Sequence, residues 1–128
     1  MIKVTVAKLV GAYEVLQKIA NATLPARESW KALRILREID KEMNTVMTAR
    51  RELCEKLSLT DENGNFIPDE NGNFIIKENK KNDFAKEMAE FFKEELEINC
   101  DKFGWEIIEK IDFAPAELLK IEDFIKEE

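Results

Sequence analysis

The fold depends on one unbroken stretch, residues 25–57, which reads PARESWKALRILREIDKEMNTVMTARRELCEKL. Pro25 suits the first turn of a helix, because its missing N–H would have no partner there, and Thr23 precedes it as a cap. At about 1.5 Å per residue such a helix spans roughly 50 Å, so it needs more than one neighbour along its length. A heptad-like seam, interrupted only at Arg50, contains Ala32, Leu36, Ile39, Met43, Val46, Leu53 and Leu57.

Upstream of this stretch the pattern changes. Ile2, Val4 and Val6 alternate with polar residues, which predicts a short edge strand. Thr5 can then cap a helix over residues 5–21. Gly11 weakens that helix by up to about 1 kcal/mol relative to alanine, and a close helix crossing would give it a purpose.

Downstream lies a direct repeat. The seven residues DENGNFI occupy positions 61–67 and again 69–75, with Pro68 between them. An Asn-Gly pair supplies the positive φ angles of a type I′ turn, so the second copy predicts a β-hairpin within residues 61–77. Pro68 forbids a central strand and favours an edge.

The remainder supplies further packing elements. An apolar stripe with acidic flanks predicts a third helix over residues 80–95. Residues 96–126 then provide a short strand able to pair with the N-terminal one, followed by a short C-terminal helix that starts at Pro115. The many apolar residues of this segment indicate packing rather than a loose tail.

Together these segments predict a single domain, residues 1–128, of the mainly α class. The expected architecture is an elongated three-helix bundle around one long central helix. The first and third helices would lie along the two halves of the long one. The short β-hairpin would cap one end, and the minor terminal strands would close the opposite end.

The net charge of −7 is unevenly distributed. Residues 1–57 hold 11 basic and 7 acidic side chains, whereas residues 58–128 hold 9 and 20. Either the two halves neutralise each other, or the acidic half faces a basic partner. The long helix also carries a basic stripe, which we interpret as a solvated face or as salt bridges to the third helix. Direct nucleic-acid binding is disfavoured by the acidic balance and the lack of interleaved aromatics. The stripe consists of Arg27, Lys31, Arg34, Arg37 and Lys41.

Several kinds of chemistry lack their usual residues. With no histidine, Ser-His and Cys-His nucleophile pairs are missing, and the four glycines form no phosphate loop. Cys54 and Cys100 have no metal-site spacing, and we expect both to be reduced and partly buried. The repeated Asp-Glu-Asn-Gly does not fit a calcium loop, because Leu59 or Ile67 would occupy the first ligand position. We therefore expect a non-enzymatic, cytoplasmic protein with no cofactor, metal or membrane span.

The best candidates for partner binding are apolar and acidic side chains of the second half. Two strands alone cannot bury both of their faces, so either the helices cover the hairpin or it docks a partner or a second copy of the chain. The candidate residues are Phe66, Ile67, Phe74, Ile75, Glu87, Glu90 and Glu94.

The chain also resembles a family of small uncharacterised proteins encoded by tailed phages and prophages of Gram-positive bacteria. The resemblance rests on the opening strand with Leu9-Val10, the segment from Leu16-Gln17-Lys18 to Leu24-Pro25, the long charged helix, the Asp-Glu-Asn-Gly turn, and Pro115 to Leu119 followed by Phe124-Ile125. It implies a phage context, in the host cytoplasm or on the virion, without an assigned activity. Two functions are open: a structural or assembly-linked binding protein, with a virion protein as partner, or an acidic, anti-CRISPR-like inhibitor of a host defence protein.

Overall fold

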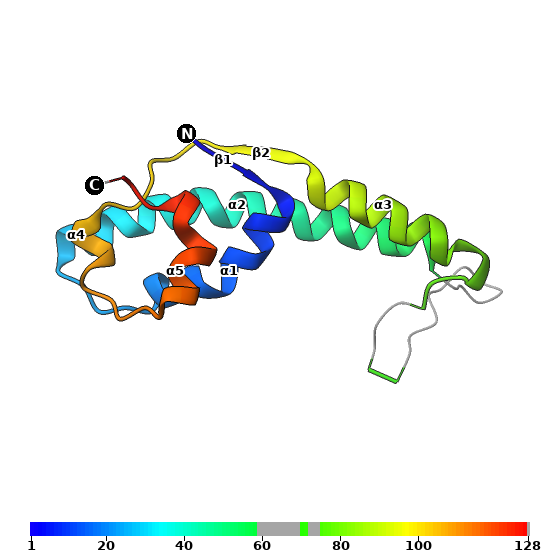
Figure 1. The fold of residues 1–128 in the computed structure, drawn as a ribbon, viewed down its shortest axis with the longest axis horizontal. Helices are drawn as coiled ribbons and strands as arrows, with labels where there is room; N and C mark the ends of the chain where they lie inside the picture. The colour runs from blue at the N-terminus through cyan, green and yellow to red at the C-terminus, as the bar shows by residue number, and fades with distance from the viewer. Residues whose placement is uncertain (59–69, 72–74, 128) are drawn as a thin grey trace.

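The computed structural model describes residues 1–58, 70–71 and 75–127, apart from the side chain of Glu78. It is mainly helical and elongated, with a small antiparallel sheet beside one long helix (Figure 1). The named elements are β1 (Ile2–Thr5), α1 (Val6–Ala20), α2 (Ala26–Leu57), η1 (Glu78–Lys80), α3 (Lys81–Lys93), β2 (Glu95–Ile98), α4 (Trp105–Ile108), α5 (Pro115–Ile121) and η2 (Glu122–Phe124).

The long helix α2 is present, with 32 residues that extend over about 48 Å. Its start differs from the expectation, because Pro25 occupies the cap position itself and no side chain caps the helix. The backbone N–H of Ser29 donates to the carbonyl of Pro25 (2.9 Å) and its hydroxyl to the carbonyl of Leu24 (3.2 Å). Six of the seven predicted seam residues are buried: Ala32, Leu36, Ile39, Met43, Val46 and Leu57.

We use the name body for α1, the sheet, α4, α5 and η2 together with residues 26–46 of α2. Within the body, Thr5 caps α1 as predicted, because its hydroxyl accepts a hydrogen bond from the N–H of Lys8 (3.2 Å). Helix α1 packs against α2 and α5, and also contacts α3. The fully buried side chains of this core include Ile2, Leu9, Leu16, Ile19, Ile39, Ile98, Phe103, Ile107, Ile121 and Phe124.

The predicted pairing of the two terminal strands is confirmed. Strands β1 and β2 are antiparallel, with Ile2 opposite Ile98 and Val4 opposite Leu96. Their expected place is wrong, because they lie beside the middle of α2 and α4 occupies the far end (Figure 1). Helix length explains this: the 13 residues of α3 return only about 20 Å along α2 before β2 begins.

We use the name arm for residues 47–57 of α2 together with α3, which lie side by side (Figure 1). Lys56 of α2 forms an ion pair with Glu87 of α3 (3.8 Å). Beyond Val46, the buried residues described in α2 reduce to Leu57, and Leu53 is half-buried. The arm is therefore much more thinly packed than the body.

The predicted hairpin of residues 61–77 falls mostly outside the described residues, and so do Phe66, Ile67 and Phe74. The described residues 76 and 77 lie against the end of the long helix. Ile76 pairs with Ser58 in an antiparallel bridge, and the N–H of Lys77 donates to the carbonyl of Leu57 (3.0 Å).

Three expectations about single residues are wrong. Gly11 lies exposed on α1, and a Cβ placed there would meet no atom within 4 Å, so it marks no helix crossing. Trp105 and Leu119, two of the apolar residues of the 96–126 segment that was expected to pack, are 36% and 68% exposed. The buried aromatic residue of this region is instead Phe103, whose backbone pairs with residues 124–126.

Candidate binding surfaces

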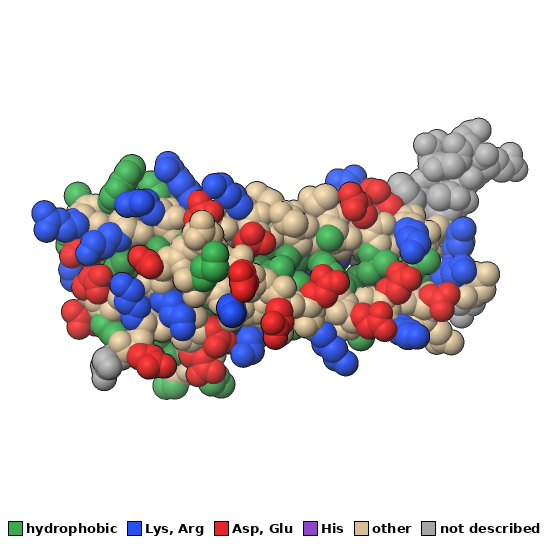
Figure 2. All heavy atoms as spheres, turned by 90° about the horizontal axis from the view of Figure 1, so that it is seen from above, with side chains coloured by type: hydrophobic (Ala, Val, Ile, Leu, Met, Phe, Trp, Pro, Cys, Tyr) green, Lys and Arg blue, Asp and Glu red, His purple; other side chains and the backbone are tan. Residues whose placement is uncertain are grey.

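The acidic candidates lie on one helix in the described arm. Glu87, Glu90 and Glu94 follow each other at steps of three and four residues, which places them along one face of α3 and its end. Glu90 and Glu94 are exposed, whereas Glu87 is half-buried beside Lys56. Figure 2 shows acidic side chains following the edge of the arm. The structure thus brings these three candidates together.

Beside these carboxylates lies the apolar stripe of α3. Phe91 and Phe92, whose ring centroids are 5.9 Å apart, pack against the edge of the core. Phe84 and Met88 continue the stripe toward the tip of the arm and are half-buried. None of the described residues of α3 is fully buried. Apolar side chains are visible between the two helices of the arm (Figure 2).

Of the four hairpin candidates, the structure describes Ile75. Ile75 is half-buried and lies next to the bridge that Ile76 forms with Ser58. Phe66, Ile67 and Phe74 lie outside the described residues.

The basic stripe of α2 does not bridge to α3, contrary to one of its two expected roles. Lys31 pairs with Glu106 of α4 (3.7 Å) and Lys41 with Glu38 of its own helix (3.0 Å). The reason is positional, since the stripe lies in the body and α3 lies along the other half of α2. Trp30 is 57% exposed within this stripe, so the expectation that it carries no aromatic residue is also wrong.

A pocket of about 560 Å³ lies where α2, the 99–104 segment and the C-terminal segment meet. Ile35 and Ile107 form buried parts of its wall, and Cys100 contributes a half-buried thiol. Burial, together with the nearby Glu38 carboxylate, raises the pKa of that thiol to about 11. We did not predict this pocket, because its lining comes from segments far apart in the sequence that carry no shared motif. Its charged lining residues are Lys31, Arg34, Glu38, Asp101, Lys102, Glu106 and Lys126.

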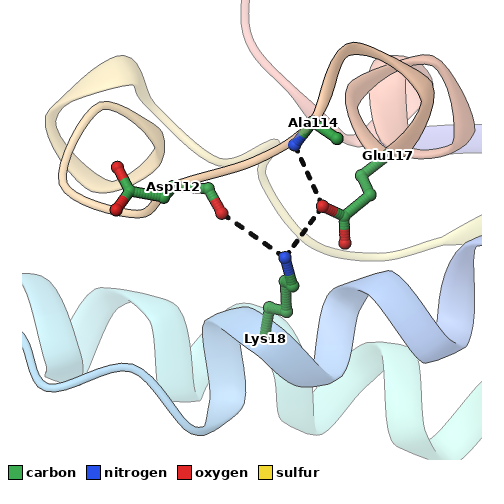
Figure 3. Close-up of polar contacts among 4 residues, drawn as sticks. All are labelled: Lys18, Asp112, Ala114 and Glu117. Atoms are coloured by element: carbon green, nitrogen blue, oxygen red, sulfur yellow. Dashed lines mark hydrogen bonds and ion pairs between the residues drawn. The ribbon is translucent and has the colours of Figure 1, made fainter.

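A polar cluster ties α1 to the start of α5 (Figure 3). The Lys18 ammonium donates to a Glu117 carboxylate oxygen (2.8 Å) and to the carbonyl of Asp112 (3.4 Å). The same Glu117 oxygen accepts the N–H of Ala114 (2.9 Å). These bonds, first that from Lys18, lower the pKa of Glu117. The cluster binds two elements of the body to each other and has the character of a structural contact.

Within the part of the chain that the structure describes, no group of three or more Cys, Asp or Glu residues could hold a metal ion. None of the described helices is long and apolar enough to cross a membrane. A scan of protein-family models and searches of curated proteins and of solved structures found no match to this chain.

Proposed function

We propose that this protein is a non-enzymatic binding protein whose arm engages a protein partner. The observation that carries this proposal is the incomplete burial of α3. Helix α3 places Phe84, Met88, Phe91 and Phe92 on one stripe, yet none of its described residues is fully buried. Large apolar side chains left partly in water are typical of interaction sites.

The negative charges of the arm indicate that its partner carries positive charge. Glu90 and Glu94 are exposed beside the apolar stripe, and Glu95 continues the negative charge onto β2, where Glu97 is paired with Lys3 (3.6 Å). An amphipathic helix with lysine or arginine next to its apolar face would match both features. Opposite charges would also speed the encounter, and added salt would slow it.

The resemblance to phage-encoded proteins supports a partner from a virion or from the host cell. The finer architecture that we propose is an elongated three-helix bundle with α2 at its centre, in which α3 contributes no fully buried residue among those described.

Charge reversal on α3 tests the proposal. A photo-crosslinking residue in place of Met88, within the stripe, would capture the partner in infected cells. We expect Glu90→Lys combined with Glu94→Lys to abolish the crosslink. The matched control is Glu14→Lys combined with Glu109→Lys, two exposed carboxylates of the body, which should leave it intact. Equal crosslinking in both double variants, or a captured protein with no basic segment, would contradict the proposal.

A second candidate function is inhibition of a host defence protein that binds nucleic acid. The row of carboxylates on α3 and β2 favours it, since such a row can occupy a groove that binds phosphates. Duplex DNA added to the purified complex distinguishes the two functions. Displacement of the partner by DNA supports the inhibitor, whereas a complex that DNA leaves unchanged supports a structural or assembly-linked role.

A further inference from the structure

The pocket in the body has an excess of positive charge that its own carboxylates do not neutralise. Two of its carboxylates are already engaged, Glu38 with Lys41 at 3.0 Å and Glu106 with Lys31 at 3.7 Å. Arg34, Lys102 and Lys126 have no carboxylate within salt-bridge distance among the described residues.

These three cations come from three separate segments. Arg34 lies on α2, Lys102 on the segment that follows β2, and Lys126 after η2. They share one hollow of about 560 Å³, a volume within the range of small-molecule sites. Against them stands one further lining carboxylate, that of Asp101. A ligand that satisfies all three cations must therefore carry several negative charges.

Glu106 behaves as an internal substitute for such a ligand. Its carboxylate folds back over its own backbone at the start of α4 and against Gly104, which is buried in the pocket wall. A hydrogen bond from that backbone, followed by the positive charges of Lys31 and Lys126, lowers its pKa. Among the lining carboxylates, that of Glu106 thus already offsets part of the positive charge, and a stronger anion could replace it.

We propose that this pocket binds a polyphosphate group, either free or as the phosphate tail of a nucleotide. Arg34 offers the planar fork of donors that matches phosphate oxygens, and the lysines supply point charges around it. A chain of two or three phosphates carries more negative charge than a single phosphate, so it offsets more of these cations. This site is separate from the arm and does not depend on the function proposed for it.

Calorimetric titration with tripolyphosphate, ATP and inorganic phosphate at fixed salt tests the proposal. Tripolyphosphate should bind more tightly than inorganic phosphate. Arg34→Gln should weaken its binding about tenfold, the effect of losing a charged hydrogen-bond donor. Arg37→Gln is the matched control, because Arg37 is exposed on the same helix outside the pocket lining, and it should change the affinity less than about twofold, as a remote screened charge does.

Glu106→Gln gives a readout of opposite sign, since removal of the internal carboxylate should strengthen binding several-fold. A misfolded variant could not produce that gain. ATP that binds more tightly than tripolyphosphate would identify a nucleotide site, and equal affinities would identify a site for polyphosphate alone. The proposal is overturned if neither tripolyphosphate nor ATP binds at millimolar concentration. It is also overturned if Arg37→Gln weakens binding as much as Arg34→Gln.

Discussion

The body and the arm share one continuous helix yet differ sharply in how they are packed. In the body, α2 meets α1, the sheet and α4, and its inward residues Ala32, Leu36 and Ile39 are buried. In the arm it meets α3, and no described residue of that partner helix is fully buried. The comparison shows that an apolar seam can continue along a helix while the core does not, because burial depends on the number of neighbours.

The largest effect is expected in the body. Phe124 is 0% exposed, and Phe124→Ala should lower the free energy of unfolding by about 3–5 kcal/mol, from lost burial and the cavity left behind. Urea titration followed by circular dichroism measures this. Leu119→Ala is the matched control, because Leu119 is 68% exposed in the adjacent helix, and it should change stability by less than about 0.5 kcal/mol.

A smaller effect is expected in the arm. Phe84 is half-buried on α3, so Phe84→Ala should cost about 1–2 kcal/mol. Hydrogen exchange of wild-type protein should also show α3 amides opening more readily than those of α1, since local opening exposes little apolar surface there. A loss as large as that of Phe124→Ala would break the distinction between the two regions.

A gain in stability is expected at Gly11 of α1. The position is exposed, helical and open to a Cβ, so Gly11→Ala should raise the free energy of unfolding by about 0.5–1 kcal/mol. Thermal and urea unfolding measure this gain. A loss instead would mean that something packs against Gly11.

The smallest effect concerns the polar cluster of the body and appears as a pH dependence. Because Lys18 lowers the pKa of Glu117 from its ordinary 4.5, their contribution to stability is complete above about pH 5. It is lost as the pH falls through the lowered pKa of the folded state, since the unfolded chain takes up the proton first. The difference in melting temperature between wild type and Lys18→Met should therefore shrink between pH 5 and pH 3. A difference that stays constant over this range would exclude the pair as its source.

Periodicity and local chemistry predicted much of the helical structure. Thr5 caps α1 as expected, the α2 seam from Ala32 to Val46 is buried, and the alternation at both strands matched a real pairing. The position of the sheet was mispredicted, because it depends on how far α3 returns along α2. Local patterns carry no information about that distance.

The candidate sites show the same contrast between features set by local sequence and features set by tertiary packing. Glu87, Glu90 and Glu94 could be placed on one face, because helical spacing fixes their relation. The pocket could not be foreseen, since Arg34, Lys102 and Lys126 converge only through tertiary packing. Arg34 was interpreted as part of a solvated stripe, and nothing in its neighbourhood along the chain distinguishes it from Arg37.

The pairing of Ile2 with Ile98 has a consequence for synthesis on the ribosome. Strand β1 has no partner until β2 has been translated. At about 5–20 residues per second, that delay is on the order of 5–20 s. Helices α1 and α2 can form earlier from local contacts, whereas the core that contains Ile2 must wait for this long-range closure. During that interval β1 is an unpaired edge, and its short length of four residues limits the risk of wrong pairing with other chains.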